Sequence, residues 1–180
     1  NATGLSIDGD AVATEGYEIG YDSTRANSRH SFTIGTSPAF YMQLTFNCVD
    51  VSSQEPTYCG FRKTQAYAQD FTTYTDFACF GLNNAVSTGK AIIETQLNTG
   101  GVTSTDTTDV ILDNSSHTYR INVSAAGVVT FLLDGIAPTA TQAFTFDNGD
   151  VVHPMILTRY GAGAGAGDLV QLVSMEVGYQ

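Results

Sequence analysis

The sequence predicts an all-β fold, a two-sheet antiparallel β-sandwich. Side chains alternate between apolar and polar along several segments, as they do in strands with one buried face. Glycine-containing turn signals recur about every ten residues, and no segment keeps the helical period of about 3.6 residues over a dozen positions. A chain of 180 residues can bury the core of such a sandwich, so we expect one domain spanning residues 1–180.

The charge balance excludes two classes of partner. The chain has 7 Lys and Arg against 18 Asp and Glu, which gives a net charge of −11. Such a surface repels the phosphates of nucleic acids and of anionic membranes. No apolar run approaches the roughly 20 residues that a membrane-spanning helix needs. We therefore expect neither nucleic acid nor membrane as a partner.

The clearest strand runs from Phe40 to about Val51. Its apolar residues alternate strictly with polar ones, which gives one face for the core. The sequence Ser-Ser-Gln-Glu-Pro at 52–56 then interrupts the pattern with turn-forming residues. A return strand at about 57–64 would make this segment a β-hairpin.

This hairpin would place Cys48 opposite Cys59, with both side chains in the core. Directly opposed Cβ atoms lie about 4.5–5.5 Å apart, which allows a disulfide without requiring one. Two reduced thiols acting as small buried apolar groups are the alternative, and the sequence leaves both open. Cys79 lies among apolar residues and is expected in the core.

The middle of the chain predicts strands at 74–82 and 91–97, joined by a turn at 87–90. The polar stretch 98–109 is interpreted as a long connection, followed by a short strand at 110–112. Further strands are expected at 119–123, 128–133, 144–146, 151–160 and 169–177. Asp134-Gly135 is a strong hairpin signal, Pro154 suggests an edge or bulged strand, and the Gly/Ala run 161–167 suggests a flexible loop. The short strand 5–7 is expected beside the last one, since termini often lie close together.

The second half of the chain resembles the concanavalin A-like and laminin-G-like domains. The resemblance rests on the strand 117–123, the turn at Gly127, the strand 128–133, the Asp134-Gly135 turn and the Leu/Val-rich terminal strand. It implies a concanavalin A-like jelly roll. Lectins, glycanases and structural modules share this fold, so the fold alone does not determine a function.

A second resemblance covers most of the chain and is to virion structural proteins of tailed bacteriophages, notably marine ones. It rests on residues 60–63 with Tyr67, and on the segments 74–76, 106–109, 134–135, 144–152 and 176–178. It implies a capsid-surface decoration or fibre-associated module on the virion surface, with other virion proteins as partners. A homo-oligomer is common for such modules, but no residue pattern here specifies one.

The residues known to serve glycan-degrading and hydrolytic enzymes are not arranged in their usual motifs. A Glu-x-Asp-x-x-Glu strand is absent, because no Asp lies between Glu15 and Glu18. The histidines at 30, 117 and 153 are not accompanied by a Gly-x-Ser-x-Gly elbow. We therefore interpret the chain as non-enzymatic.

Calcium is the one cofactor that the sequence raises. Asp106, Asp109 and Asp113 lie in a segment rich in Thr, Asp and Asn, and carboxylate oxygens are ligands for hard cations. Aspartates in turns more often bond their own backbone, and no complete ligand pattern is present. We expect no cofactor, with a calcium site at these residues as the alternative.

Glycan binding is the other function that the residues suggest. Sugars stack on aromatic rings and hydrogen-bond to carboxylates. Tyr58, Tyr67 and Tyr74, together with Asp76, are the candidate contacts if these rings are exposed. The ligands would be host-surface glycans if the protein is a virion component. The alternative function is that of a secreted or cell-surface lectin-like domain.

Overall fold

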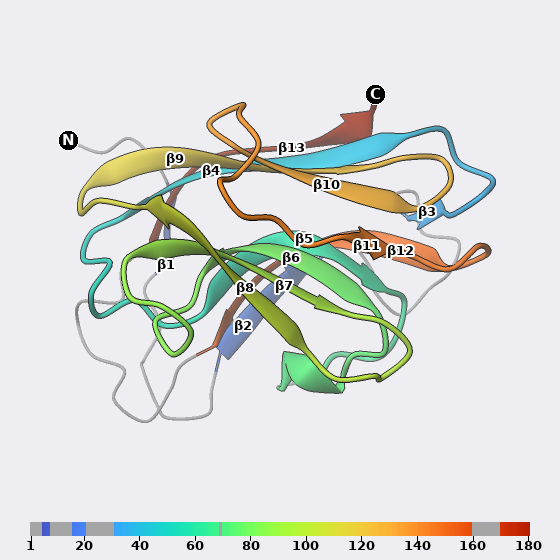
Figure 1. Cartoon of the computed structure of the whole chain (residues 1–180), viewed down its shortest axis with the longest axis horizontal. Coiled ribbons are helices and arrows are strands. Elements are labelled where there is room, and N and C mark those ends of the chain that lie inside the picture. The colour runs from blue at the N-terminus through green and yellow to red at the C-terminus, as the bar shows by residue number, and fades with distance from the viewer. Residues whose placement is uncertain (1–4, 8–15, 21–30, 69, 160–169) are drawn as a thin grey trace.

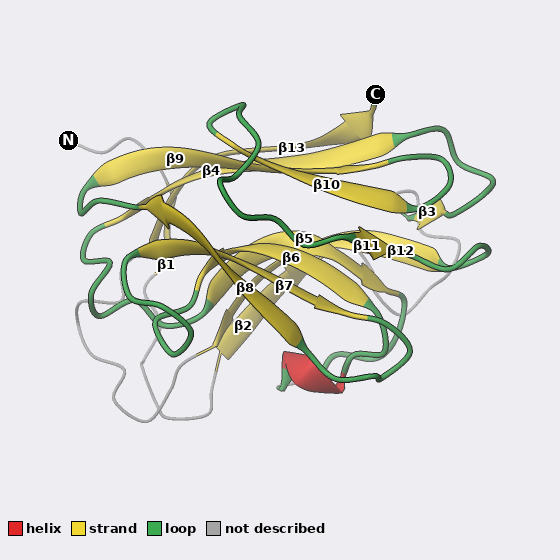
Figure 2. Cartoon of the chain, in the orientation of Figure 1, coloured by secondary structure: helices red, strands yellow, loops and turns green. Residues whose placement is uncertain are grey.

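The protein folds into two antiparallel β-sheets that stack as a sandwich (Figures 1 and 2), so the predicted fold class is confirmed. The computed structural model describes residues 5–7, 16–20, 31–68, 70–159 and 170–180. The predicted flexible loop 161–167 lies outside these residues, as do Glu15 and His30. Within the described part of the chain, no helix is long and apolar enough to cross a membrane.

The first sheet has the strand order β1-β13-β4-β9-β10-β11. Its strands are β1 (Leu5–Ile7), β4 (Phe40–Cys48), β9 (Ser115–Val123), β10 (Val128–Leu133), β11 (Phe144–Thr145) and β13 (Val170–Tyr179). β1 pairs with β13 through the register Leu5↔Leu172, which confirms that the first strand lies beside the last.

The second sheet has the strand order β2-β12-β5-β6-β7-β8, and β3 also pairs with β12. Its strands are β2 (Gly16–Gly20), β3 (Phe32–Thr33), β5 (Thr57–Lys63), β6 (Phe77–Leu82), β7 (Lys90–Gln96), β8 (Thr103–Val110) and β12 (Val151–Arg159). A single turn of 3₁₀-helix, η1 (Phe71–Thr73), precedes β6.

The main core lies between the two sheets. β4 shows the predicted alternation, since every second side chain from Phe40 to Cys48 is buried. Aromatic rings from both sheets meet in this layer: Phe40 of β4 and Phe61 of β5 pack edge to face, with ring centroids 5.0 Å apart. Such edge-to-face contacts add to the stability of the layer between the sheets.

A second apolar cluster covers the other face of the second sheet. It contains Tyr58, Phe71, Tyr74, Phe77, Cys79, Ile92, Met155 and Leu157. Phe71 and Tyr74 belong to the connection between β5 and β6, so this connection packs back over the sheet. The strands β5, β6 and β7 are therefore buried on both faces, although β5 and β7 contain polar as well as apolar residues.

The predicted hairpin between β4 and β5 is wrong. β4 pairs with β13 and β9, whereas β5 pairs with β12 and β6, so residues 49–56 cross from one sheet to the other. Cys48 and Cys59 are consequently not cross-strand neighbours, and all three cysteines are buried thiols that form no disulfide. The Cys48 thiol donates to Gln54 Oε1 at 3.1 Å, and the Cys59 thiol donates to the carbonyl of Phe80 at 3.5 Å. Of the two alternatives that the sequence left open, the structure therefore shows reduced, buried thiols.

The segment 98–109 is not one long connection, because β8 occupies residues 103–110. β8 pairs with β7 through Thr95↔Thr103 and lies at the edge of the second sheet. Its threonines are β-branched and suit a strand that is largely exposed, which is why polarity alone suggested a loop. The short strand predicted at 110–112 is also absent: β8 ends at Val110, and β9 begins at Ser115.

Pro154 lies in an interior strand, contrary to the expectation of an edge. β12 pairs with β5 on one side and with β3 and β2 on the other. The backbone N–H of Thr64 donates to Val151 and that of Arg159 to Pro56, so the odd-numbered residues of β12 face β5. Pro154 therefore faces the opposite side, at the step where the partner changes from β3 to β2. The missing N–H of the proline costs no bond to β5.

Candidate functional site

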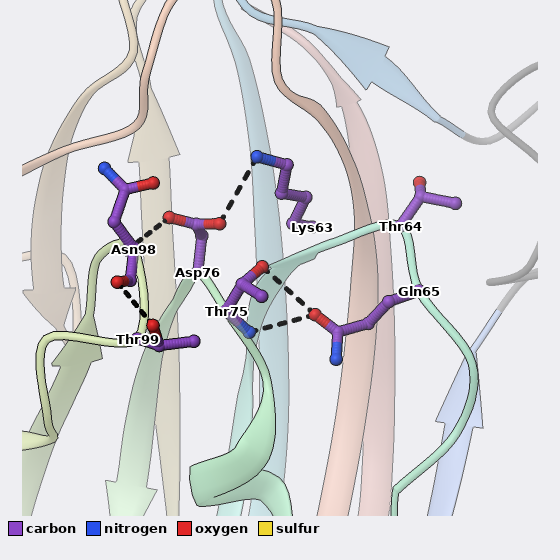
Figure 3. Close-up of a pocket in the computed structure, with 7 residues that line it drawn as sticks. All are labelled: Lys63, Thr64, Gln65, Thr75, Asp76, Asn98 and Thr99. Carbon is purple, nitrogen blue, oxygen red and sulfur yellow. Dashed lines mark hydrogen bonds and ion pairs between the residues drawn. The ribbon is translucent and has the colours of Figure 1, made fainter.

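A polar pocket lies at the end of the second sheet where β5 finishes and β6 begins. Its volume is about 450 Å³, and seven residues line it: Lys63, Thr64, Gln65, Thr75, Asp76, Asn98 and Thr99 (Figure 3). They come from the end of β5, the residues just before β6, and the turn that follows β7. The pocket thus gathers hydroxyl, amide, carboxylate and ammonium groups from three separate segments.

The turn after β7 has an unusual backbone that brings its side chains to the pocket. Asn98 and Thr99 have φ angles of 51° and 56°, in the left-handed region. Asparagine tolerates this conformation, but a β-branched threonine adopts it rarely. Two hydrogen bonds hold the turn in place: Asn98 N donates to Asp76 Oδ1 at 2.8 Å, and Thr99 N donates to the carbonyl of Thr75 at 3.0 Å.

Asp76 is the buried carboxylate of the pocket. Its side chain is fully shielded from solvent, and Figure 3 shows it between Lys63 and Asn98. Oδ1 accepts the Asn98 N–H, whereas Oδ2 lies 3.4 Å from Lys63 Nζ in an ion pair whose geometry is not that of a hydrogen bond. A buried carboxylate oxygen without a hydrogen bond is costly, and a ligand hydroxyl that reached it in place of the partly exposed Lys63 ammonium would relieve this cost.

Lys63 links the pocket to the turn before β12. Its Nζ lies 2.6 Å from Asp150 Oδ1, and this hydrogen-bonded ion pair is the main reason why the pKa of Lys63 is raised. The ammonium therefore stays protonated at neutral pH. Asn98 Nδ2 donates to Asp147 Oδ2 at 2.8 Å, which attaches the same turn a second time. These bonds make the pocket preformed.

Two further polar side chains line the pocket. Thr64 Oγ1 is shielded from solvent and has no hydrogen-bond partner in the part of the chain that the structure describes. Gln65 Oε1 accepts hydrogen bonds from Thr75, from its N–H at 2.9 Å and its hydroxyl at 3.1 Å. Hydroxyl-rich molecules match such a mixture of donors and acceptors.

A buried ion pair fastens the connection that carries Gln65 and Thr75. Arg62 is fully buried and donates to Glu18 from Nη2 at 2.7 Å and from Nε at 3.1 Å. Its Nη1 donates to the carbonyls of Lys63 and Gln65, and its guanidinium lies 4.1 Å from the centre of the Tyr74 ring. The Tyr74 hydroxyl donates to Glu18 Oε2 at 2.6 Å. Arg62 is thus positioned to hold the wall of the pocket rather than to contact a ligand in it.

The structure separates the residues that the sequence suggested for glycan binding. Tyr58 and Tyr74 are fully buried in the second apolar cluster, so the expectation that their rings are exposed is wrong. Sequence reasoning failed here because it could not show that both faces of this sheet are covered. Tyr67 is 52% exposed but does not line the pocket. Asp76 does line it.

Asp106, Asp109 and Asp113 are not brought together as the calcium alternative requires. Asp106 Oδ1 accepts the N–H of Thr108 at 2.7 Å, Asp109 accepts from the N–H and hydroxyl of Thr139, and Asp113 Oδ1 accepts the N–H of Val51 at 2.9 Å. Each carboxylate thus has a hydrogen-bond partner of its own, local for Asp106 and in a distant segment for Asp109 and Asp113. Among the described residues, no group of three acidic, histidine or cysteine side chains is placed to hold a metal ion.

Sequence reasoning missed Lys63, Asn98 and Thr99. They are distant in the chain from each other or from Asp76, and no motif connects them. The sequence Asn-Thr-Gly-Gly at 98–101 was the one available signal, because it predicts a tight turn directly after a strand. It did not indicate which other turn it would face.

Comparison with solved structures identifies the same sandwich in carbohydrate-binding proteins and in a lyase. The carbohydrate recognition domain of Emp47p has a TM-score of 0.53 and 17% identity, over 89% of this chain and 82% of that one. The carbohydrate-binding module CBM66 from Bacillus subtilis has a TM-score of 0.57 and 9% identity, over 97% and 91%. Alginate lyase PA1167 from Pseudomonas aeruginosa has a TM-score of 0.53 and 12% identity, over 97% and 88%.

These structural similarities establish a lectin-like fold, and at such low sequence identity they establish no more than the fold. No protein-family model matches the sequence, and no curated protein is significantly similar to it. The fold is found in binding modules and in a lyase alike, so the choice between these functions depends on the residues of this chain.

Proposed function

We propose that this chain is a non-catalytic carbohydrate-binding domain and that the pocket of Figure 3 receives a sugar residue. The observation that carries the proposal is Asp76, a fully buried carboxylate that lines a polar pocket with one oxygen free of hydrogen bonds. A sugar hydroxyl donating to this oxygen would form a strong charge-assisted hydrogen bond. The carbohydrate-recognition domains of similar fold support the choice of ligand class.

The remaining groups of the pocket fit the same ligand. Thr64 Oγ1 both donates and accepts, and the Lys63 ammonium donates to a hydroxyl or ring oxygen. No aromatic side chain is among the seven lining residues, so specificity would come from hydrogen bonds rather than from stacking on a ring. We place the binding energy in Asp76, Thr64 and Lys63.

The experiment is a glycan array with the purified chain, followed by titration calorimetry with the best ligand. Asp76→Asn retains the acceptor for the Asn98 N–H but replaces the anionic oxygen, so affinity should fall by about tenfold or more. Asp106→Asn is the matched control, because its carboxylate lies outside the pocket and serves the Thr108 N–H. Equal affinities for the two variants would refute the site.

The non-catalytic part of the proposal is tested separately. The pocket has a lysine held between two carboxylates, Asp76 and Asp150, and its ammonium stays protonated at neutral pH. Such a lysine is a poor general base. Incubation with the bound glycans, and with alginate as the lyase substrate, should release no shortened or unsaturated products. Turnover that persists in the purified chain would contradict the proposal.

We further infer that this domain acts on a virion surface, as a capsid decoration or fibre-associated module. The inference rests on the resemblance to virion structural proteins and on the net charge of −11, which keeps a crowded surface protein soluble. Host-surface glycans would then be the ligands of the pocket. Mass spectrometry of purified particles should detect the chain. Its absence from them would refute the virion assignment, and the function as a secreted or cell-surface lectin would remain.

A further inference from the structure

A second cavity lies beside the free edge of the first sheet. Its volume is about 560 Å³. One wall is β10, and the other is formed by residues 141–145 of the connection that leaves β10 and returns at β11 (Figure 1). Its apolar lining residues include Val129, Phe131, Leu132 and Phe144, and no charged side chain lines it. The cavity therefore favours an uncharged and mainly apolar occupant.

The outer wall of this cavity is held in place by the second sheet. The N–H of Ala140 donates to the carbonyl of Thr107 in β8 at 3.1 Å. The hydroxyl of Thr139 donates to Asp109 at 2.6 Å, and that of Thr105 donates to Gln142 Oε1 at 3.1 Å. These bonds join the connection to β8 across the open side of the sandwich. The cavity is thus preformed, which lowers the entropic cost of binding.

The backbone N–H and C=O of Phe131 point to the cavity side of β10, where neither has a hydrogen-bond partner among the residues that the structure describes. Ser124 N donates to Val128 O, so the even-numbered residues of β10 face β9 and the odd-numbered residues face the other edge. On that edge Val129 pairs with β11, and Leu133 exchanges two hydrogen bonds with Ile136. Phe131 lies between them and pairs with no described residue on that side.

These unused groups are costly because Phe131 is only 2% exposed. A buried backbone N–H and C=O are normally satisfied by protein or by an ordered water. The two groups point the same way from one residue, as they do toward a neighbouring strand. A partner that offers one acceptor and one donor side by side would satisfy both.

We propose that this cavity binds a small, uncharged and mainly apolar molecule that carries one secondary amide. The amide C=O accepts from the N–H of Phe131, the amide N–H donates to its carbonyl, and the apolar body of the ligand packs against Val129, Leu132 and Phe144. An extended peptide fits less well, because β11 and the Leu133–Ile136 bridge leave one residue of free edge. The site is separate from the sugar pocket and independent of its function.

The test uses acetanilide as the probe and two-dimensional NMR of the ¹⁵N-labelled chain. Acetanilide should shift the backbone amide signals of Phe131, Ala143 and Phe144, while those of Thr64 and Asn98 in the sugar pocket stay in place. N-methylacetanilide lacks the N–H donor and should bind about tenfold more weakly. Equal affinity for the two probes, or no shifts up to the solubility limit, would overturn the proposal.

Two variants and one further probe sharpen the test. Ala143 is exposed at the wall of the cavity, so Ala143→Trp should fill it and weaken acetanilide binding at least tenfold. Ala85→Trp, at an exposed position in the turn between β6 and β7, should leave binding unchanged. If Ala143→Trp does not fold, the comparison of acetanilide with N-methylacetanilide on the unmodified chain still tests the proposal. Tighter binding of N-acetylglucosamine than of acetanilide at the same amides would show that the apolar ligand class is wrong.

Discussion

Arg62 of β5 reaches across β12 to Glu18 of β2, and its Nη2 lies 2.7 Å from the Glu18 carboxylate. Both side chains are almost completely removed from solvent, at 0% and 4% exposure. β2 and β5 do not pair with each other, because β12 lies between them. The ion pair therefore connects strands that the backbone hydrogen bonds leave apart, and it also anchors the connection that forms one wall of the sugar pocket.

Removing the charge of Glu18 should destabilise the fold strongly. Glu18→Gln leaves the Arg62 guanidinium buried without a counter-charge, which typically lowers the free energy of unfolding by about 3 kcal/mol. Urea denaturation measures the change. Glu176→Gln, at a carboxylate that accepts from the exposed Tyr41 hydroxyl, should change it by less than about 0.5 kcal/mol. Similar midpoints for the two variants would show that the pair is energetically neutral.

The protein should lose stability in mild acid through His153. Burial is the main cause that lowers the pKa of His153 to about 3, and the nearby Arg62 adds to it. The unfolded chain binds a proton near pH 6.5 and the folded chain does not, so this stability is complete above pH 6.5 and falls as the pH drops toward 3. Between pH 6.5 and 5 the loss should approach about 2 kcal/mol.

His153→Gln isolates this contribution. The variant should show a flatter dependence of unfolding free energy on pH over the same interval, because it lacks the group that titrates. Denaturation curves at several pH values measure both proteins, and the other histidines are common to the two. Parallel pH profiles would exclude His153 as the source.

Two glycines in hairpin turns should respond differently to alanine. Gly127 and Gly135 have φ angles of 85° and 83°, so an added methyl group strains the backbone at both by about 1–2 kcal/mol. At Gly127 the new Cβ would also lie 2.6 Å from the carbonyl of Phe146 and 2.9 Å from Ile34, whereas nothing lies within 4 Å at Gly135.

Gly127→Ala should therefore lower the free energy of unfolding by about 3 kcal/mol, and Gly135→Ala by about 1 kcal/mol. Chemical denaturation of both variants gives the comparison. If Gly135→Ala is the more destabilising of the two, then contact with the Phe146 carbonyl does not explain the sensitivity of Gly127 to substitution.

The three cysteines should be unreactive in the folded protein. All are buried, and burial raises the pKa of the Cys59 and Cys79 thiols, which removes the reactive thiolate. A thiol reagent at pH 8 should label none of them until denaturant is added, and then all three. Labelling of a single cysteine in the unfolded, unreduced chain would reveal a disulfide between the other two.

Local patterns in the sequence were sufficient for the fold class and for most strands. The strict alternation from Phe40 to Cys48 and the Asp134-Gly135 turn both report short-range geometry, which neighbouring residues determine. β8 was missed for the complementary reason. An edge strand with exposed threonines carries no apolar signal, and its identity depends on pairing with β7.

The partner of each strand was decided by the tertiary structure. The link 49–56 has the turn chemistry of a hairpin, yet it joins two different sheets: β5 pairs with β12 and β6, and each of its faces packs against an apolar cluster. That choice separated Cys48 from Cys59 and buried Tyr58 and Tyr74. The sugar pocket was equally invisible in the sequence: Lys63, Asp76 and Asn98 meet because the β5–β6 connection and the turn after β7 lie at the same end of one sheet. Short-range chemistry thus determined most of the strands, whereas the burial of apolar faces determined where their ends, and so their polar residues, come together.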